Sequence, residues 1–336
     1  MTRLGRVTFR ASPDLRYGAA MANVLTLGEL LIDFVPDRSG VTLGEAERFL
    51  KAAGGAPANV AVGLRRLGVE AGFIGKVGDD PFGHWLADVL RRDDVDTRQL
   101  RFDDAARTAL AFVSLTAEGD RDFMFYRHPS ADQLHRPDEL DLDEIGRAQI
   151  LHHGSISLIQ EPSRSATLAA IDAARAAGAT ISYDPNLRLP LWPSATAARE
   201  GIRSAWQLAH VIKISDDELD FLTGSRDLAA APSLLHDELR LLLVTLGGGG
   251  VAWFAGERSG RVAGFEVETR DTTGAGDAFV AGVLAAVARD PRLAADEGAL
   301  ETALRRANAY AALTTTRSGA IPALPSAEEL ERFLAR

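Results

Sequence analysis

The chain has 336 residues and a net charge of −10 at pH 7, and 46% of its residues are hydrophobic and 25% are charged. These values are ordinary for a globular protein with a packed core, and the acidic balance argues against a nucleic-acid-binding protein, which would present a basic face. The sequence has no cysteine, which excludes disulfides, thiolate zinc sites and cysteine nucleophiles. No apolar run approaches the roughly 18 residues that a membrane-spanning helix needs.

The first 20 residues differ from the rest of the chain. They hold four arginines and a single acid and show neither helical nor strand periodicity. Two interpretations stay open, a short targeting segment or a start assigned too early, with Met21 as the first residue of the folded protein. We expect the second, so that residues 1–20 form an extension without regular structure. The lack of cysteine is compatible with a reducing cytoplasm, where we expect the protein to reside.

Apolar runs and the residues that interrupt them predict the first elements. The stretch from Val24 to Val35 is strand-like, interrupted at Gly28-Glu29 and stopped by Pro36. Residues 57–67 predict a helix, because proline occupies its first turn and Gly68 follows its end.

Strands and helices then alternate with short connections. The sequence predicts strands at 72–77, 150–153, 180–183, 211–214 and 239–246, and helices at 81–92, 162–177, 195–209 and 216–222. Such alternation is typical of an α/β fold with a mostly parallel central sheet and helices on both faces. A hairpin at 109–116 and 122–126 and the stretch 34–50 do not fit this pattern. We expect a single domain over 21–336, with a small β lid contributed by about 34–50 and 107–127.

The most informative segment is Asp271-Thr272-Thr273-Gly274-Ala275-Gly276-Asp277-Ala278-Phe279. The apolar residues after Gly274 recur at helical spacing, so the glycines lie at the start of a helix. Small residues at this point leave the backbone amides unobstructed. Together with the helix dipole, such amides form a site for a phosphoryl group that carries developing charge.

Asp277 lies in the first turn of that helix, beside the anion site. An ionised carboxylate there can accept a proton from an attacking hydroxyl. The structural alternative is an aspartate that only complements the helix dipole, an effect worth up to about 1 kcal/mol. No G-x-x-x-x-G-K-[ST] loop occurs, and the glycines at 247–250 precede a strand instead of a helix. The glycines and the acid therefore favour phosphoryl transfer on a scaffold other than a P-loop or a dinucleotide-binding fold.

Two motifs identify a family. Residues 271–279 resemble the C-terminal motif of the PfkB, or ribokinase-like, carbohydrate kinases, and Gly54-Gly55-Ala56-Pro57-Ala58-Asn59-Val60-Ala61 resembles their N-terminal motif. The resemblance runs from about Met21 to the C-terminus and implies the ribokinase-like fold. Further stretches look like those of the fructokinases within this family, at 28–33, 123–127, 130–132, 154–158 and 184–188.

The resemblance implies roles for individual residues. Asp277 would be the general base for a sugar hydroxyl, and the amides of Gly274, Ala275 and Gly276 would form the anion hole. The residues implied to bind the sugar are Asp33, Gly55, Asn59, Arg107, Arg127 and Arg188. The three arginines could reach the sugar or the transferring phosphate. Solvated surface positions are the alternative, most of all for Arg107.

The resemblance also implies a nucleotide site and two kinds of cation site. The residues expected on the nucleotide side are Asn186, Lys213, Ser215, Glu218, Thr245, Gly247, Gly250, Gly276 and Asn308. Glu218 would position Mg²⁺ through water, but Ser215 and Glu218 also make a complete capping box, and many relatives have asparagine at position 215. Relatives hold a monovalent cation at the positions of Asp271, Thr273, Arg317 and Gly319, so a potassium requirement is one implication.

The implied activity is transfer of the γ-phosphoryl group of Mg-ATP to a primary hydroxyl, with fructose as the expected sugar. The nearest alternative is a 2-keto-3-deoxygluconate kinase, whose substrate carboxylate Arg127 and Arg188 could bind; another sugar or a nucleoside is a further alternative. A binding protein without activity is a different class, against which the intact Gly-Ala-Gly-Asp argues. The expected partners are ATP and a small sugar, without nucleic acid or membrane, and we expect a homodimer formed through the β lid.

Overall fold

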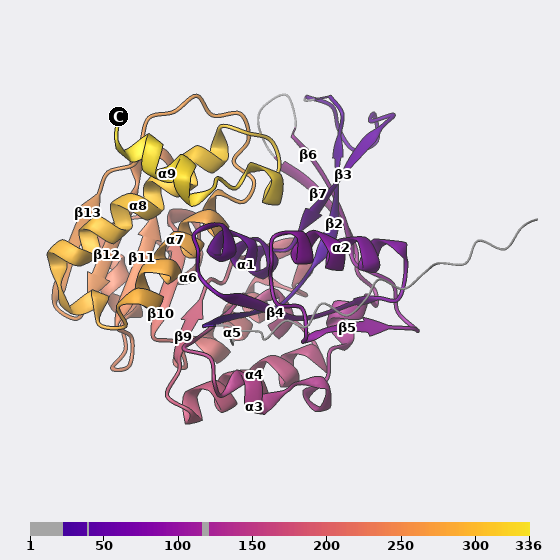
Figure 1. Cartoon of the computed structure of the whole chain (residues 1–336), viewed down its shortest axis with the longest axis horizontal. Helices are drawn as coiled ribbons and strands as arrows, with labels where there is room; N and C mark the ends of the chain where they lie inside the picture. The colour runs from indigo at the N-terminus through magenta and orange to yellow at the C-terminus, as the bar shows by residue number, and fades with distance from the viewer. Residues whose placement is uncertain (1–22, 39, 116–120) are drawn as a thin grey trace, which may run out of the picture.

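The computed structural model describes residues 23–38, 40–115 and 121–336, and a nine-stranded sheet forms its centre (Figure 1). All strands from β11 across to β5 pair in parallel, whereas β12 and β13 are antiparallel to their neighbours. The order across the sheet is β13 (Arg258–Val262), β12 (Val251–Ala255), β11 (Leu241–Thr245), β10 (Val211–Ser215), β9 (Thr180–Tyr183), β8 (Ile150–His153), β1 (Val24–Leu27), β4 (Ala71–Gly78) and β5 (Leu100–Asp103).

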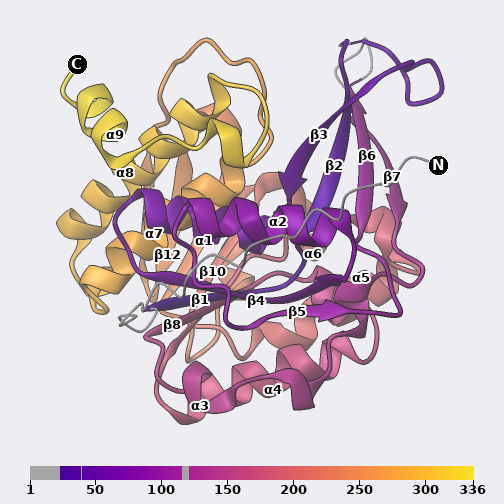
Figure 2. The same cartoon turned by 45° about the vertical axis from the view of Figure 1, so that its right-hand side comes forward.

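Helices cover both faces of this sheet (Figures 1 and 2). Successive residues along a strand enter different cores, so that Val24 packs on one face and Leu25 on the other. One face carries α1 (Ala56–Arg66), α2 (Pro81–Arg92), α7 (Ala275–Arg289), α8 (Glu297–Thr315) and α9 (Ala327–Leu334), and the other carries α3 (Leu142–Ile145), α4 (Ser163–Ala176), α5 (Ala195–Trp206) and α6 (Asp216–Thr223). The predicted α/β architecture, a mostly parallel sheet between two helical layers, is confirmed.

A four-stranded sheet projects away from the helical layers (Figure 2). Its order is β3 (Phe49–Gly54), β2 (Leu31–Pro36), β6 (Leu110–Leu115) and β7 (Arg121–Tyr126). The outer pairs are antiparallel, and β2 pairs in parallel with β6. The two segments from which we expect a lid supply most of this sheet, although residues 116–120 lie outside the described residues. That the sheet works as a lid on a single domain stays a prediction.

The apolar stretch 24–35 forms two strands, so the expectation of a single strand is wrong. The first part, β1, belongs to the large sheet, and the second part, β2, belongs to the small one. The chain turns at Gly28, whose φ is +153° and where a Cβ would lie 2.7 Å from Cγ of Pro57. Glu29 therefore occupies the point at which the chain crosses from one sheet to the other.

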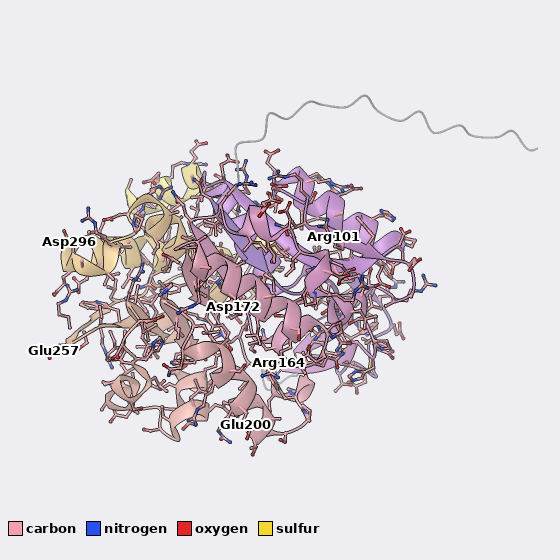
Figure 3. All side chains as sticks on the ribbon, turned by 90° about the horizontal axis from the view of Figure 1, so that it is seen from below. Arg101, Arg164, Asp172, Glu200, Glu257 and Asp296 are labelled. Carbon is pink, nitrogen blue, oxygen red and sulfur yellow. The ribbon has the colours of Figure 1, made fainter. Side chains whose placement is uncertain are left out.

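The outer helices are amphipathic. The charged side chains of Arg164 and Asp172 on α4 and of Glu200 on α5 lie on the outer surface (Figure 3), whereas Ile171 and Ile202 on the same helices are buried. Within the described parts of the chain, no helix combines the length and the apolar character that a membrane span requires.

Candidate active site

A cavity of about 440 Å³ lies between the four-stranded sheet and the first turns of α1 and α7. Loops that follow β1, β8 and β9 contribute to its wall, so it opens at the carboxyl ends of parallel strands, where α/β sheets bind their ligands. The predicted site residues that line it are Asp33, Gly55, Asn59, Asn186, Arg188, Asp271, Thr273, Gly274, Asp277 and Gly319. Residues far apart in sequence thus meet in one cavity, as the family resemblance implies.

The glycine-rich turn begins α7 as predicted. Gly274 is the N-cap residue, with a left-handed φ of 78°, and it offers no side chain to cap the helix. A helix has no internal acceptors for its first backbone N–H groups, and such groups can be offered to a ligand. Within this turn, N of Ala275 donates to the carbonyl oxygen of Thr272 at 3.3 Å. Gly274 lines the cavity, and Ala275 and Gly276 follow it in that first turn.

The Asp277 carboxylate is buried in the cavity wall and is held by two asparagine amides. Nδ2 of Asn59 donates to Oδ2 at 2.7 Å, and Nδ2 of Asn186 donates to Oδ1 at 3.3 Å. Nη1 of Arg188 donates to Oδ1 of Asn186 at 2.7 Å, which sets the orientation of that amide. Burial raises the pKa of Asp277, while the hydrogen bond from Asn59 and the charges of Lys213 and Arg188 act in the opposite direction.

A buried ion pair lies behind the turn. Nζ of Lys213 is 3.1 Å from Oδ2 of Asp184, and both side chains are at most 10% exposed. A Cβ at Gly276 would lie 3.2 Å from the same Nζ, so the ammonium group reaches the start of α7. Burial raises the pKa of Asp184, although the positive charge of Lys213 works to lower it. Burial works to lower the pKa of Lys213, but the negative charges of Asp184 and Glu218 outweigh it, so that this pKa is raised. The pair therefore places a positive charge beneath the anion site.

Glu218 uses both carboxylate oxygens on backbone amides. Oε2 accepts from N of Ser215 at 2.8 Å, and the hydroxyl of Ser215 accepts from N of Glu218 at 3.1 Å, which is the capping box at the start of α6. Oε1 accepts from N of Leu187 at 2.7 Å, next to Asn186 and Arg188. The capping alternative for Glu218 is thus realised, and its link to magnesium stays a prediction. The described residues contain no group of three or more His, Cys, Asp or Glu side chains arranged to hold a metal ion.

The other residues expected on the nucleotide side lie outside the cavity and form their own neighbourhood. Thr245 ends β11, and Oγ1 donates to the carbonyl oxygen of Ile214 at 3.3 Å. Gly250 lies so close to β13 that a Cβ would be 2.1 Å from the carbonyl oxygen of Val262. Nδ2 of Asn308 donates to that same oxygen at 3.1 Å. Gly247, at a φ of 54°, completes the turn after β11.

Three of the four residues expected at a monovalent cation lie together. Oδ1 of Asp271 accepts from N and Oγ1 of Thr273 at 2.9 and 2.6 Å, and Oδ2 accepts from N of Gly319 at 2.8 Å. The side chain of Arg317 instead pairs with Glu329, which lies on α9. A cation role for Arg317 would therefore involve its backbone.

The three arginines differ in position. Arg188 lines the cavity. Arg127 is 2% exposed and pairs with Asp132. Arg107 is exposed, and its backbone forms an isolated β-bridge with Ser130. Neither Arg127 nor Arg107 lines the cavity. The surface alternative thus describes Arg107, whereas Arg127 is a buried residue behind the cavity wall.

Four charged residues that line the cavity are not among the residues predicted from the sequence, namely Glu29, Asp37, Arg38 and Arg270. The sequence carries a sign of Glu29, because it is an acid inside an otherwise apolar stretch. In the structure its side chain is only 4% exposed, which is rare for a glutamate. Arg38 and Arg270 lie in segments without periodicity, where local sequence carries no sign of their position.

Gly55 predicts a sensitive position in the cavity. Its φ is +111°, and a Cβ there would lie 2.3 Å from the carbonyl oxygen of Glu29, a backbone atom that cannot move aside. We expect Gly55→Ala to lower kcat/KM for the sugar by about 10- to 100-fold, as roughly 1–3 kcal/mol of backbone strain would. Gly68→Ala is the matched control, because Gly68 also has a positive φ, lies just after the end of α1, and has no neighbour within 4 Å of a Cβ. Equal losses in steady-state assays of the two variants would contradict this expectation.

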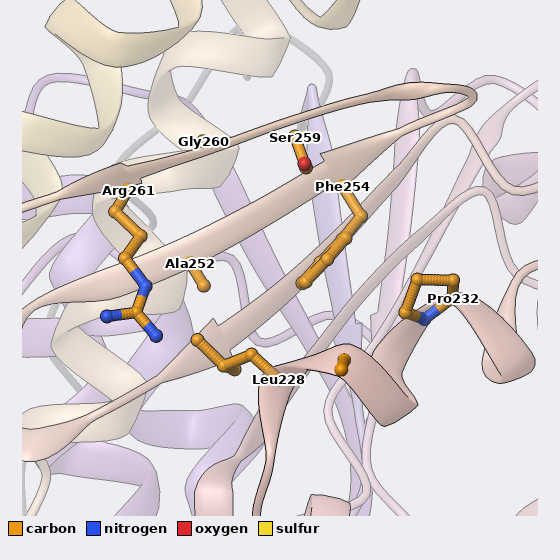
Figure 4. A pocket seen from close by; sticks show the side chains of 8 residues that line it. Leu228, Pro232, Ala252, Phe254, Ser259, Gly260 and Arg261 are labelled. Carbon is orange, nitrogen blue, oxygen red and sulfur yellow. The ribbon is translucent and has the colours of Figure 1, made fainter.

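A second cavity of about 380 Å³ lies between β12–β13 and the 3₁₀ segment η5 (Leu228–Leu234) (Figure 4). Apolar side chains such as Leu228, Pro232 and Phe254 line it, together with the exposed Arg261. It shares no lining residue with the first cavity and contains none of the predicted site residues. The candidate active site is therefore the cavity around Asp277.

Comparison with protein families gives a match to the pfkB family carbohydrate kinases over residues 21–327. Probable fructokinase-2 of Arabidopsis thaliana is 55% identical over 313 residues, which cover 93% of this chain and 95% of that protein. Fructokinase-2 of Solanum lycopersicum is 55% identical over 308 residues, covering 91% and 94%.

Solved structures agree with these sequence relatives. Fructokinase from Xylella fastidiosa with bound ATP is similar to this chain with a TM-score of 0.84 at 36% identity, covering 94% of this chain and 99% of that one. Fructokinase from Vibrio cholerae in its fructose, ADP and calcium ion bound form has a TM-score of 0.81 at 37% identity, covering 94% and 99%.

The fold and the site together define a phosphotransferase whose acceptor is an alcohol group. The chain belongs to the pfkB family of carbohydrate kinases. The predicted family resemblance and the ribokinase-like fold are thereby confirmed.

Proposed function

We propose that this chain transfers the γ-phosphoryl group of ATP to the primary 6-hydroxyl of fructose, giving fructose 6-phosphate. The observation that carries the proposal is the Asp277 carboxylate, which lies at the amide end of α7 in a cavity lined by polar side chains. Relatives that are 55% identical and named fructokinase support the choice of sugar, and so does the similar Vibrio cholerae enzyme with bound fructose and ADP.

In the proposed reaction, Asp277 takes the proton from the attacking hydroxyl. Because burial raises its pKa, the carboxylate is a stronger base than an exposed aspartate. The two asparagine amides on its oxygens fix where the proton is received. The amides of Gly274, Ala275 and Gly276 would stabilise the charge that develops on the phosphoryl group. The four-stranded sheet would act as the lid that excludes water.

Most of the residues that we propose to bind the sugar line the cavity around Asp277. Asp33, Gly55, Asn59 and Arg188 would hold the sugar, and Arg127 would act on them from behind the wall. ATP would extend from the start of α7 toward the turn after β11, and the residues proposed to meet it are Asn186, Lys213, Ser215, Glu218, Thr245, Gly247, Gly250, Gly276 and Asn308.

Magnesium would arrive with ATP. Mg²⁺ is usually held by substrate phosphates, water and one or two carboxylates, and it neutralises charge on the phosphates. Both oxygens of Glu218 already accept backbone amides, so this carboxylate fits contact through water better than direct ligation. Potassium would lie near Asp271, Thr273, Arg317 and Gly319; a Vibrio cholerae fructokinase structure that contains a potassium ion supports this part of the proposal.

A coupled assay with Mg-ATP against fructose, 2-keto-3-deoxygluconate, ribose and adenosine tests the proposed function. We expect the highest kcat/KM for fructose, with fructose 6-phosphate as the product. Arg38, Arg188 and Arg270 line the cavity and favour 2-keto-3-deoxygluconate, with its carboxylate, as the second candidate. Higher kcat/KM for that acid would reject fructose, and no turnover with any of the four would reject a kinase for these substrates.

We also propose a homodimer formed by the four-stranded sheet. Four large hydrophobic side chains on its strands are exposed, Val35 by 41%, Leu50 by 64%, Met124 by 43% and Tyr126 by 58%. Val35 and Leu50 lie on the face of the sheet that lines the cavity, and Met124 and Tyr126 lie on the opposite face. Exposed apolar side chains on both faces favour an interaction surface on this sheet. Light scattering on the full chain is expected to give twice the mass of one chain, and Leu50→Asp is expected to give a monomer. A monomeric wild type would contradict the proposal.

The cytoplasmic location stays part of the proposal, on the ground that the chain lacks cysteine. One relative is named probable fructokinase-6, chloroplastic, of Arabidopsis thaliana. Imaging of the full chain with a C-terminal fluorescent tag tests the proposal, and signal confined to an organelle would contradict it.

A further inference from the structure

Glu29 lies where the two sheets, the cavity and helix α1 meet. It follows β1 of the large sheet and precedes β2 of the small sheet. It lines the cavity and is only 4% exposed. A buried acid in a sugar cavity needs partners that offset the loss of water, and these partners indicate what the acid does.

The first partner of Glu29 is the start of helix α1. Oε1 of Glu29 accepts from the backbone N of Ala56 at 2.9 Å. Gly55 is the N-cap of α1 and has no side chain that could accept a hydrogen bond. The carboxylate of Glu29, 27 residues before Ala56, accepts the hydrogen bond that a capping side chain would otherwise accept. Asn59 lies three residues after Ala56, and its amide is the 2.7 Å donor to Asp277. The position of the α1 end therefore sets the position of the amide that holds the proposed base.

A buried charge pair at the base of the small sheet contributes to the electrostatic environment of Glu29. Arg127 directly follows β7 and pairs with Asp132, whose Oδ1 accepts from the hydroxyl of Ser130 at 2.5 Å. Nε of Arg127 is buried and has no hydrogen-bond partner among the described residues. Burial raises the pKa of Glu29 to about 7, Arg127 lowers it and Asp132 raises it again. The other acids that line the same cavity are Asp33, Asp37, Asp271 and Asp277.

We propose that Glu29, at the crossing between the two sheets, is a positioning residue that holds the first turn of α1 through its hydrogen bond from the amide of Ala56. It acts on the sugar through the Gly55–Ala56 turn and Asn59 and takes no part in proton transfer. The inference rests on the proposed sugar kinase activity.

Two substitutions separate the capping contact from the charge. Glu29→Ala leaves the amide of Ala56 without its acceptor, and we expect KM for fructose to rise about tenfold or more, the cost of an unsatisfied buried donor. KM for ATP is expected to stay unchanged, because the nucleotide residues lie on other elements. Glu29→Gln keeps an oxygen that can accept from the amide of Ala56 but loses the negative charge of Glu29. Its KM for fructose should therefore lie between those of the wild type and Glu29→Ala.

The pH dependence gives a readout that a merely structural role would not change. Ionised Glu29 holds Ala56 by a charge-assisted hydrogen bond, which is stronger than the neutral bond. We expect KM for fructose in the wild type to fall about fivefold as Glu29 ionises between about pH 6 and about pH 8. In Glu29→Gln, the part of this change that is due to Glu29 should be absent, and any change that remains belongs to other groups such as Asp184, whose raised pKa of about 7 falls in the same range. Comparison of the two proteins removes any contribution from Asp277 or Asp184, which both retain.

Glu144→Gln is the matched control, because Glu144 is a buried acid paired with Arg98 and does not line the cavity. It should leave both KM values at wild-type levels. Three outcomes would each overturn the inference. KM for fructose could be unchanged in both Glu29 variants, or KM for fructose and KM for ATP could rise equally. The third outcome is a Glu29→Gln variant whose KM for fructose depends on pH as in the wild type. Turnover by the wild type tests the proposed function separately: if no sugar is phosphorylated, the proposed function and this inference both fail.

Discussion

Asp277→Asn is expected to lower kcat with fructose by about 10²- to 10⁴-fold, the usual loss when a general base is removed. The amide has the same size as the carboxylate but cannot take the proton of the sugar hydroxyl. KM for fructose should change much less, because Asn59 and the cavity walls remain. Steady-state assays at saturating ATP measure both constants.

The same variant makes a prediction about stability. Because burial raises the pKa of Asp277, folding favours its protonated form, and the ionised form costs folding free energy above its ordinary pKa. We therefore expect Asp277→Asn to be at least as stable as the wild type at neutral pH, with the difference shrinking as the pH falls toward about 4.

Asp290→Asn is the control for Asp277→Asn, since Asp290 ends the same helix and is exposed. It should retain full activity. Substantial activity in Asp277→Asn, with Asp290→Asn unchanged, would remove the assignment of Asp277 as the base.

Lys213→Met is expected to lower the free energy of unfolding by about 3–5 kcal/mol at alkaline pH, where it leaves a buried carboxylate without its cation. Nζ of Lys213 is 3.1 Å from Asp184, and the two side chains are 10% and 5% exposed. Denaturant titration measures the loss. Activity should fall as well, because the ammonium group lies next to Gly276 at the anion site.

The loss should depend on pH in a definite direction. Lys213 opposes the rise in the pKa of Asp184, so its removal raises that pKa further. A raised folded-state pKa favours the protonated acid, and the stability is then lost as the pH rises through it. Because the pKa of Asp184 is already raised to about 7 beside Lys213, we expect the defect of Lys213→Met to be small below about pH 7 and to grow as the pH rises above it. The double variant Asp184→Asn with Lys213→Met should recover most of the stability. A loss below about 1 kcal/mol, or one independent of pH, would contradict the buried ion pair.

Local patterns predicted the elements that depend on local sequence. The spacing after Gly274 correctly placed the start of α7, because a helix start is set by the residues within one turn. The alternation of strands and helices correctly predicted the parallel sheet. The stretch 24–35 was misjudged, because an apolar run shows that a segment is buried and does not show which sheet buries it.

Long-range contacts were beyond the sequence. The resemblance assigned Asn59 to the sugar and Asn186 to the nucleotide, whereas in the structure both amides contact Asp277, across 218 and 91 residues of chain. A local sequence pattern cannot predict contacts between residues so far apart in the chain. Glu218 shows the opposite case, because the Ser215–Glu218 spacing predicted a capping box and the structure contains it.

A crystal structure with fructose and a non-hydrolysable ATP analogue tests whether Asp277 and the start of α7 meet the reacting groups. We predict the primary hydroxyl of fructose within hydrogen-bond distance of the Asp277 carboxylate, and the terminal phosphate of the analogue on the amides of residues 274–276. Fructose bound away from Asp277, or a terminal phosphate remote from the start of α7, would contradict the account.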